Sequence, residues 1–300
     1  MMKKVLASGL SLVVAAGVMT GCTKPKDEEK VLNVQFVPSQ SAETLEAKAK
    51  PLEKMLGDKL GMKVKVSVST DYPTIIEAMS SKKVDVGFLP PSAYVLAKQK
   101  NAADVILQSL RYGVNEKDGS PTKDKVEYYK AQYVVKADSP IKSIADLKGK
   151  KIAFQNVTSS AGYVWPAVEL KEAGVDPLKD VKPITLKGHD QALLSVLNGD
   201  VDAAATFQDA RNLLKKEHPD IFAKTKVIYV TKPIPNDTVA VRPGIDPELK
   251  NKVTQAFLDL SNDPKAVEIF RSIYTHEGYV KTDDSKFASV REYETKAKKD

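Results

Sequence analysis

The chain has 300 residues and a net charge of +7, and 42% of its residues are hydrophobic. A chain of this length and composition can bury a sizeable core and suits two domains better than one. Basic and acidic residues are interleaved, and no stripe of basic and aromatic residues suggests nucleic-acid binding. The single cysteine excludes an internal disulfide and a zinc cluster of thiolates.

Three zones make up the amino terminus. Lys3 and Lys4 are followed by an uncharged apolar run at residues 5–19 and then by small residues before Cys22. The run is 15 residues long, whereas a membrane-spanning helix needs about 20 apolar residues. We therefore predict a cleaved signal peptide at residues 1–21, with a retained anchor helix as the alternative.

The only cysteine directly follows the predicted signal peptide. Residues 19–22 read Met-Thr-Gly-Cys and resemble a bacterial lipobox, in which the thiol receives diacylglycerol and the new amino terminus is acylated. By that resemblance Cys22 carries palmitate-type chains and anchors the protein at the extracytoplasmic face of the cell membrane. Residues 22–30 are polar and charged, which predicts a short flexible tether.

After the tether, short β-branched runs alternate with segments of helical period, a pattern typical of an α/β fold with mostly parallel sheets. We predict strands at residues 32–37, 63–69, 84–88, 105–110, 131–135, 152–154, 181–186, 203–207, 226–230 and 238–241. A helix is expected at residues 44–60, and Pro247, Pro264 and Ser285 each open another helix after Asp246. The polar segment 111–130 predicts an excursion or a hairpin.

Two segments indicate where the chain crosses between two lobes. The strand at residues 132–135 leads into Ser139 and Pro140, and the strand at residues 238–241 follows a segment with two prolines. We therefore predict a first lobe made of residues 31–133 and 239–300, and an inserted second lobe made of residues 134–238. Two such connections permit hinge closure around a ligand.

Three hydroxyl residues, Thr158, Ser159 and Ser160, stand between a predicted strand and a predicted helix. The free amide groups and the dipole at a helix start favour anions, and hydroxyl groups add donors without a competing negative charge. Gly162 allows the backbone to approach a ligand closely. The pattern predicts an anion site, and an ordinary serine N-cap is the alternative.

A second polar turn, around His189, follows the strand predicted at residues 181–186, where a parallel strand delivers its ligand-facing loop. His189 can donate a hydrogen bond to an oxyanion, and a capping or surface histidine is the alternative. His218 and His276 have charged or helical neighbours and are expected at the surface. Neither has the spacing of a metal ligand.

Two acids and two tyrosines also border predicted strands. Asp209 and Asp237 carry no accompanying motif of glycosidase chemistry, and Asp209 can alternatively be the N-cap of a helix at residues 210–217. Tyr72 and Tyr94 lie at strand-to-helix turns of the first lobe. Their phenol groups can wall a polar ligand, and core packing is the alternative.

Enzyme signatures are missing from the sequence: it has no nucleophile elbow, no zinc-protease motif and no glycine-rich phosphate or dinucleotide loop. We therefore expect no catalytic residue, no cofactor and no metal. A binding protein is the leading interpretation, with an enzyme of a related two-lobed type as an alternative.

The segments from about residue 31 to residue 260 together resemble the phosphonate, phosphite and phosphate receptors of ABC importers. The matching motifs occur in the family's order: Thr70-Asp71-Tyr72, Val84-Asp85-Val86-Gly87, Pro91-Ser92-Ala93-Tyr94, the run from Thr158 to Tyr163, Gly188-His189-Asp190, the run from Val201 to Ala205, and Ile234-Pro235-Asn236-Asp237. The resemblance implies an α/β, two-lobed, periplasmic-binding-protein-like type II fold. It also implies capture of a small phosphorus oxyanion and its delivery to ABC permease subunits.

The resemblance also implies roles for single residues. The phosphorus oxygens would be held by Thr158, Ser159, Ser160 and His189. Tyr72 and Tyr94 would close the cleft from the other lobe. Asp209 and Asp237 would face the substituent. Family members that take 2-aminoethylphosphonate hold its ammonium with acids at these two places, and here the first is Asp where Glu is familiar. The shorter acid and the apolar Phe207 leave phosphite, methylphosphonate and phosphate open as ligands.

We expect a monomer whose partners are the ligand, the permease and, through the Cys22 lipid, the membrane, with no nucleic acid among them. The same fold can also serve as a ligand sensor or as a surface adhesin. The sequence does not separate these uses from import.

Overall fold

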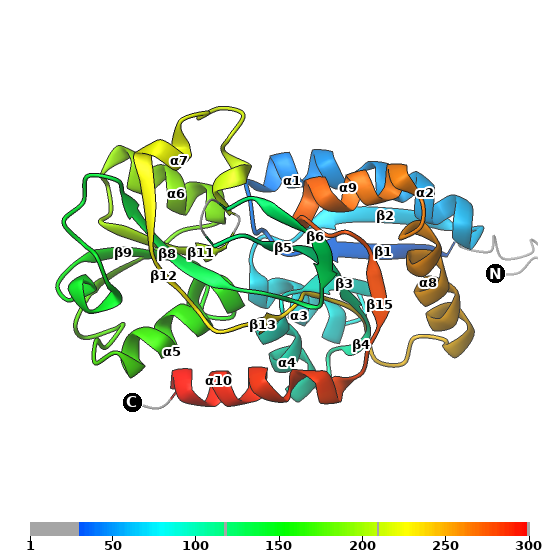
Figure 1. Ribbon diagram of the computed structural model, residues 1–300. Helices are drawn as coiled ribbons and strands as arrows, with labels where there is room; N and C mark the ends of the chain where they lie inside the picture. Colours follow the sequence, from blue (N-terminus) through cyan, green and yellow to red (C-terminus); the bar gives the residue numbers. More distant parts are fainter. Residues whose placement is uncertain (1–29, 117–118, 209, 299–300) are drawn as a thin grey trace, which may run out of the picture.

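The computed structural model describes residues 30–116, 119–208 and 210–298. Two lobes lie side by side, each built around its own sheet, as Figure 1 shows. The sheet of lobe 1 is built from the first and the last strands of the described chain, and the sheet of lobe 2 from strands between them. The predicted signal peptide, Cys22 and Asp209 lie outside the described residues.

Lobe 1 contains a six-stranded sheet with the order β15-β4-β14-β3-β1-β2. Its strands are β1 (Val31–Phe36), β2 (Lys63–Val68), β3 (Val86–Leu89), β4 (Asp104–Ser109), β14 (Thr238–Val241) and β15 (Tyr279–Lys281). Strands β1 to β4 share one direction, and β14 and β15 run against them. The sheet is therefore mixed, because the returning strand β14 lies between β3 and β4.

Helices flank this sheet. They are α1 (Ala42–Ala49), α2 (Pro51–Leu60), α3 (Tyr72–Ser80), α4 (Pro91–Gln99), α8 (Pro247–Leu260) and α9 (Pro264–Tyr274). The single helix predicted at residues 44–60 is wrong: it is divided into α1 and α2, because Pro51 lacks an amide N–H and disrupts a helix interior. The three helices predicted after Asp246 are confirmed as α8, α9 and α10 (Ala288–Lys298).

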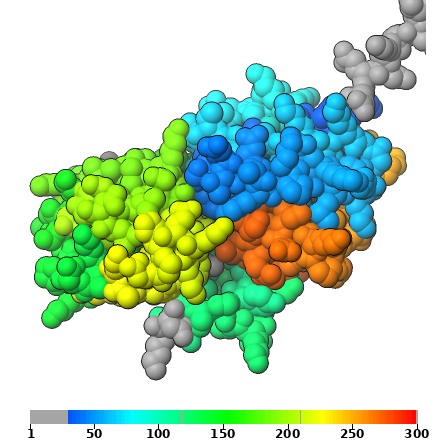
Figure 2. Space-filling model, turned by 90° about the horizontal axis from the view of Figure 1, so that it is seen from above, coloured from blue at the N-terminus to red at the C-terminus, as the bar shows by residue number. Residues whose placement is uncertain are grey.

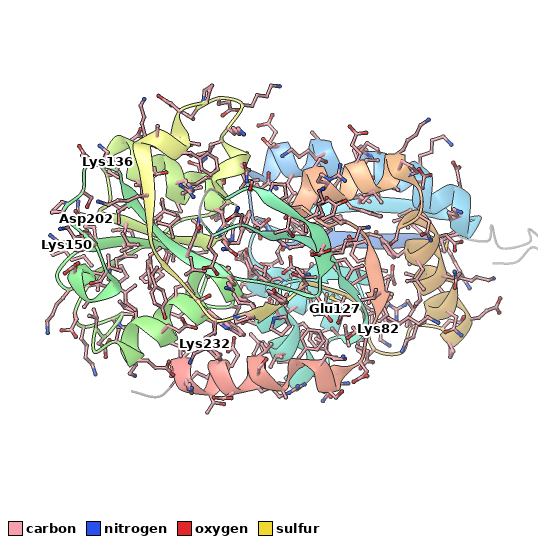
Figure 3. The ribbon with its side chains drawn as sticks, viewed as in Figure 1. Lys82, Glu127, Lys136, Lys150, Asp202 and Lys232 are labelled. Atoms are coloured by element: carbon pink, nitrogen blue, oxygen red, sulfur yellow. The ribbon has the colours of Figure 1, made fainter. Side chains whose placement is uncertain are left out.

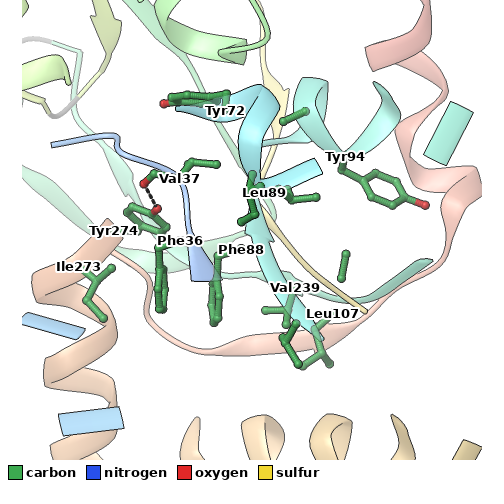
Figure 4. Close-up of a cluster of buried hydrophobic side chains, with 14 of the residues drawn as sticks. Phe36, Val37, Tyr72, Phe88, Leu89, Tyr94, Leu107, Val239, Ile273 and Tyr274 are labelled. Atoms are coloured by element: carbon green, nitrogen blue, oxygen red, sulfur yellow. Dashed lines mark hydrogen bonds between the residues drawn. The ribbon is translucent and has the colours of Figure 1, made fainter. Parts of the chain in front are cut away.

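An aromatic cluster lies at the centre of lobe 1 (Figure 4). Phe36 on β1 and Phe88 on β3 stack with their ring centroids 4.2 Å apart, and Tyr274 contacts Phe36 edge-on at 5.6 Å. The Tyr274 hydroxyl donates to the carbonyl oxygen of Val37 at 2.6 Å. Such aromatic pairs add to the energy of apolar burial. The cluster thus fixes the end of β1, from which the chain enters the region between the lobes.

Lobe 2 contains a five-stranded sheet with the order β10-β9-β11-β8-β12. Its elements are β8 (Ala131–Lys136), β9 (Lys151–Phe154), β10 (Lys182–Thr185), β11 (Ala203–Phe207), β12 (Thr225–Val230), α5 (Trp165–Glu172), α6 (His189–Asn198) and α7 (Ile221–Lys224). Strands β9, β10 and β11 are parallel, and β8 runs against both β11 and β12. A short π-helical turn, Ser160–Val164, precedes α5, so Pro166 falls in the first turn of α5, where proline is tolerated.

The chain crosses between the lobes at a small two-stranded sheet. Strand β7 (Tyr128–Tyr129) pairs there with β13 (Ile234–Pro235). The crossings lie a few residues from the predicted ones, because β8 pairs with β11 from Ala131 to Val135 and so belongs wholly to lobe 2. The excursion predicted at residues 111–130 is confirmed as a hairpin of β5 (Arg111–Val114) and β6 (Pro121–Val126).

Helix α10 forms a third link, running along both lobes in Figure 1. The ring of Tyr293 on α10 stacks on Trp165 of lobe 2, with centroids 4.3 Å apart and planes 11° apart. The Tyr293 hydroxyl donates to the buried carboxylate of Glu169 at 2.9 Å. At the beginning of the same segment, Phe287 contacts Tyr94 of lobe 1 at 5.0 Å. The carboxyl-terminal helix therefore holds both lobes.

Charged side chains cover the outer surface of both lobes. Lys136, Lys150 and Asp202 lie at the outer end of lobe 2, away from the crossings, as Figure 3 shows. Within the described residues, no helix is both long enough and apolar enough to cross a membrane.

Candidate functional site

A closed cavity of about 40 Å³ lies between the lobes. Its described lining is Val37, Ser39, Gln40, Tyr72, Pro90, Arg111, Tyr129, Asp237, Ile273, Tyr274 and Thr275 from lobe 1 and the crossing, and Ser159, Ala161, His189, Phe207 and Leu213 from lobe 2. Figure 2 shows α1 and α9 pressed against lobe 2 on one face of the molecule. The cavity is enclosed because the lobes meet around it.

Ser159 brings a hydroxyl group from lobe 2 into the cavity wall. It precedes the π-helical turn, and its Oγ accepts a hydrogen bond from the Gly162 amide at 3.1 Å. Its own hydroxyl hydrogen is thus available to another acceptor. The buried phenol of Tyr72, from the start of α3 in lobe 1, interacts with the Ser159 side chain across the cavity. Burial raises the pKa of Tyr72 well above its ordinary value, so this phenol stays a donor.

His189 lies at the first position of α6, also in the lobe 2 wall. Its ring contacts Phe207 edge-on at 4.7 Å, and its Nδ1 is buried without a hydrogen-bond partner among the described residues. Burial, helped by the charge of Arg111, lowers the pKa of His189 to about 3. The ring is therefore neutral at pH 7 and can direct one N–H at an acceptor in the cavity.

A buried ion pair lies in the lobe 1 wall. The Arg111 Nη2 donates to Asp237 Oδ2 at 2.9 Å, and the side chains are 8% and 13% exposed. The ring Nε2 of His276 lies 3.1 Å from the same oxygen. The surface position expected for His276 is wrong: the residue is 1% exposed, because its ring fits between Asp237 and the hydroxyl of Tyr279.

Four hydrogen bonds close the lobes on one another at the rim of the cavity. The amide of His189 donates to Ser39 O at 2.9 Å, and the amide of Ser41 donates to Asp190 Oδ2 at 3.0 Å. On the other side, Ser160 Oγ accepts from the Ser92 amide and donates to Ser92 Oγ, both at 2.9 Å. The described conformation is accordingly a closed one.

The cavity wall brings together Tyr72, Ser159, His189 and Asp237, four of the predicted residues. Thr158 instead hydrogen-bonds Asn156 Oδ1 through its amide and hydroxyl groups, and Ser160 binds Ser92 as described.

Tyr94 lies outside the cavity lining. Its hydroxyl donates to Asp284 Oδ1 at 2.7 Å, and Figure 4 shows it well apart from Tyr72, with the two hydroxyl groups pointing in different directions. The reason is helical geometry: Tyr94 is the fourth residue of α4, so its side chain turns toward α10 rather than toward the end of the strand.

Sequence reasoning missed Arg111, Tyr129 and Thr275. Arg111 directly follows the strand predicted at residues 105–110. His189 was singled out because it is a polar residue after a predicted strand, and the same criterion applies to Arg111. Tyr129 lies in the polar segment 111–130, for which no site was predicted. Thr275 follows α9 and belongs to no sequence motif that indicates a binding site. Thr275 reaches the site by accepting a hydrogen bond from Arg111 Nη1 at 2.8 Å.

Comparison with known proteins identifies the family of this chain. Residues 34–287 match the family described as ABC transporter, phosphonate, periplasmic substrate-binding protein. The chain belongs to this family. It is therefore an extracytoplasmic substrate-binding component of an ABC importer and not an enzyme. Within the described residues, no group of His, Cys, Asp or Glu side chains is arranged to hold a metal ion.

Two relatives illustrate the range of the family. The phosphate-import protein PhnD of Mycolicibacterium smegmatis is 26% identical over 273 residues, which cover 86% of this chain and 82% of that protein. The phosphonates-binding periplasmic protein of Escherichia coli is 27% identical over 244 residues, which cover 80% of this chain and 69% of that protein.

Two solved structures share the fold of this binding protein. The binding component of a Pseudomonas aeruginosa phosphonate transporter superposes with a TM-score of 0.78 at 22% identity, covering 90% of this chain and 87% of that one. PhnD1 of Prochlorococcus marinus, solved in complex with methylphosphonate, gives 0.77 at 19% identity, with 89% and 98% covered. The predicted two-lobed type II fold is thus confirmed.

Proposed function

We propose that this binding protein captures a small phosphorus oxyanion, such as phosphate, phosphite or methylphosphonate, in the closed cavity and delivers it to its permease. The observation that carries the proposal is the unpartnered Nδ1 of His189, buried beside the Ser159 hydroxyl in an enclosed cavity. A buried ring nitrogen without a partner is costly, and the tautomer with the hydrogen on Nδ1 makes it a donor. An oxyanion oxygen would supply the missing acceptor.

The cavity volume supports a compact ligand. About 40 Å³ corresponds to roughly three water positions, which suits a phosphorus atom with its oxygens and at most a very small substituent. The neutral donors of lobe 2 suit an anion because they form charge-assisted hydrogen bonds without a counter-ion that must be desolvated.

Closure couples capture to transport. The hydrogen bonds from His189 and Ser160 to lobe 1 join residues beside the cavity to the opposite lobe. A ligand that bridges the lobes favours the closed form by as much as its affinity for the two forms differs. The permease would then recognise the closed form.

We also propose that Cys22 carries the lipid anchor implied by the lipobox resemblance, and that the protein works as a monomer. A short tether keeps the receptor at a high effective concentration beside its permease. Replacing Cys22 with alanine should release soluble protein that binds ligand as the anchored form does. Loss of binding together with the anchor would contradict this separation of roles.

Isothermal titration calorimetry tests the ligand assignment. Phosphate, phosphite and methylphosphonate are titrated in turn, with sulfate as a control oxyanion. We expect tight binding of at least one phosphorus compound and weaker binding of sulfate. If none of the three produces heat, or if sulfate binds best, the proposed function is wrong.

The variant Ser159→Ala sharpens this test. Loss of a hydrogen bond to a charged ligand costs about 1.5 to 3 kcal/mol, so the Kd of the best phosphorus ligand should rise roughly 10- to 150-fold. Ser160→Ala is the matched control, since Ser160 binds Ser92 rather than lining the cavity. We expect a smaller rise there, about fivefold, from a weaker closed form. Equal effects of the two substitutions would contradict the assignment of Ser159.

A further inference from the structure

The charged pair in the cavity wall is unlike the rest of the lining. Among the described lining residues, Asp237 is the one acidic side chain and Arg111 the one arginine or lysine. Their contact of 2.9 Å is buried, so the pair adds no net charge to the wall. A ligand that enters therefore meets a carboxylate whose charge is already compensated.

Several contacts hold Arg111 in this position. Its Nη1 donates to Thr275 Oγ1 at 2.8 Å. Its guanidinium carbon lies 4.7 Å from the ring centroid of Tyr129 and 5.6 Å from that of Phe207, distances at which a cation is attracted to an aromatic face. The guanidinium is planar and stays charged. It therefore remains on Asp237 as part of the wall.

The Asp237 carboxylate stays ionised in this setting. Burial by itself raises the pKa of Asp237, but the adjacent Arg111 charge and the hydrogen bond with His276 lower it further than burial raises it. Both Arg111 Nη2 and His276 Nε2 approach the same atom, Oδ2. Oδ2 of the carboxylate is thus occupied from the side of lobe 1.

Arg111 also separates two cavities. Together with Tyr129 it lines this cavity and a larger neighbouring hollow of about 310 Å³, whose lining includes Lys130 and Gln208. A substituent longer than a methyl group would have to extend past the guanidinium to reach that space. Arg111 thus limits both the charge and the length of the ligand.

Building on the proposed function, we infer that the Arg111–Asp237 pair selects against phosphorus ligands with a cationic substituent. The guanidinium compensates the charge of Asp237 and occupies its Oδ2, so a ligand's ammonium would compete with a cation that is already in place. Among the described lining residues there is no second acidic side chain, and an ammonium without a carboxylate partner in a buried site is strongly disfavoured. The preferred substrate class is therefore a compact phosphorus oxyanion without an amino group.

Calorimetry with methylphosphonate and 2-aminoethylphosphonate tests this inference. We expect the native protein to bind methylphosphonate at least about tenfold more tightly, because the amino compound gains no charged hydrogen bond and must desolvate its ammonium. In Arg111→Met, the Asp237 carboxylate is released and the wall is shortened. The ratio of the two Kd values should then shift toward the amino compound by roughly 10- to 100-fold. Adding Asp237→Asn to this variant should abolish the shift.

Arg242 offers a matched control. Its Nε donates to Asp85 Oδ1 at 2.8 Å, and the side chains are 19% and 12% exposed, but neither residue lines the cavity. Arg242→Met should lower the melting temperature and leave the Kd ratio unchanged. A melting curve for each variant separates misfolding from altered selectivity, and the ratio in the native protein tests the inference without any substitution.

Two results would overturn the inference while leaving the proposed function intact. One is a native protein that binds the amino compound as tightly as methylphosphonate. The other is an Arg111→Met variant that loses affinity for both compounds equally, which would make Arg111 a ligand of the phosphorus oxygens. If the native protein binds no phosphorus compound, the proposed function fails and the inference fails with it.

Discussion

The two walls of the cavity differ in charge and in construction. The lobe 2 wall presents neutral donors, Ser159 and His189, each next to the start of a helical segment that follows a strand. The lobe 1 wall presents the ion pair of Arg111 and Asp237, which are 126 residues apart in sequence. Neutral hydrogen-bond donors can bind any oxyanion of suitable size. A fixed charged pair, in contrast, favours or disfavours an anion according to the charge of its substituent. On the proposed function, lobe 2 would hold the ligand and lobe 1 would select it.

The largest effect should come from separating the two walls. Gly188, with φ of +85°, precedes His189, and a Cβ at this position would lie 3.1 Å from the carbonyl carbon of Gln40 in the opposite lobe and would collide with Asp190. In Gly188→Ala we expect a 10- to 100-fold higher Kd for the best phosphorus ligand, from about 1 to 3 kcal/mol of overpacking in the closed form. Calorimetry measures the change.

Gly174→Ala is the matched control for this substitution. Gly174 has a nearly identical φ of +83°, but a Cβ there would meet nothing within 4 Å. Backbone strain of about 1 to 3 kcal/mol should therefore lower the stability of both variants, while only Gly188→Ala should weaken binding. Similar Kd values for the two variants would show that the lobes do not meet at Gly188.

A pH titration of stability tests whether the lobe 2 wall is neutral. The pKa of His189 falls to about 3 in the folded protein, against about 6.5 in an unfolded chain. Below pH 6.5 the unfolded chain therefore binds a proton that the folded protein excludes, and stability falls as the pH falls. From pH 6.5 to pH 5 we expect a loss of about 1.6 kcal/mol from this residue.

Urea unfolding at these two pH values measures the loss. His276, whose pKa is also lowered by burial, acts in the same direction, so the informative comparison is the native protein against His189→Gln. Between these pH values the variant should lose about 1.1 kcal/mol per pH unit less than the native protein. An unchanged slope would mean that the lobe 2 wall carries a cationic His189.

The smallest effects should separate two tyrosines of lobe 1. Tyr72→Phe removes a donor from the cavity and should raise the ligand Kd about fivefold, a cost of about 1 kcal/mol. Tyr94→Phe removes the hydrogen bond to Asp284, outside the cavity lining, so it should lower stability by about 1 kcal/mol without changing the Kd. Weaker binding in Tyr94→Phe alone would reverse the roles of these residues.

The sequence predicted the lobe 2 wall better than the lobe 1 wall for a physical reason. Ser159 and His189 each follow a strand within a few residues, so a local pattern places them at the ligand-facing edge. The partnership of Arg111 with Asp237 depends on β14 inserting between β3 and β4, which no local pattern reveals. Tyr94 was misjudged because its motif shows that a helix begins there but not which way the side chain points.

The link through α10 has an optical consequence. Trp165 is the only tryptophan in the sequence, and its fully buried ring lies flat against Tyr293 at the contact between lobe 2 and the carboxyl-terminal helix. All indole emission of this protein therefore originates at this one contact. If α10 remains with lobe 1 when the lobes part, the indole becomes exposed to water and its emission shifts to the red. If α10 remains with lobe 2, the emission stays constant through the same motion.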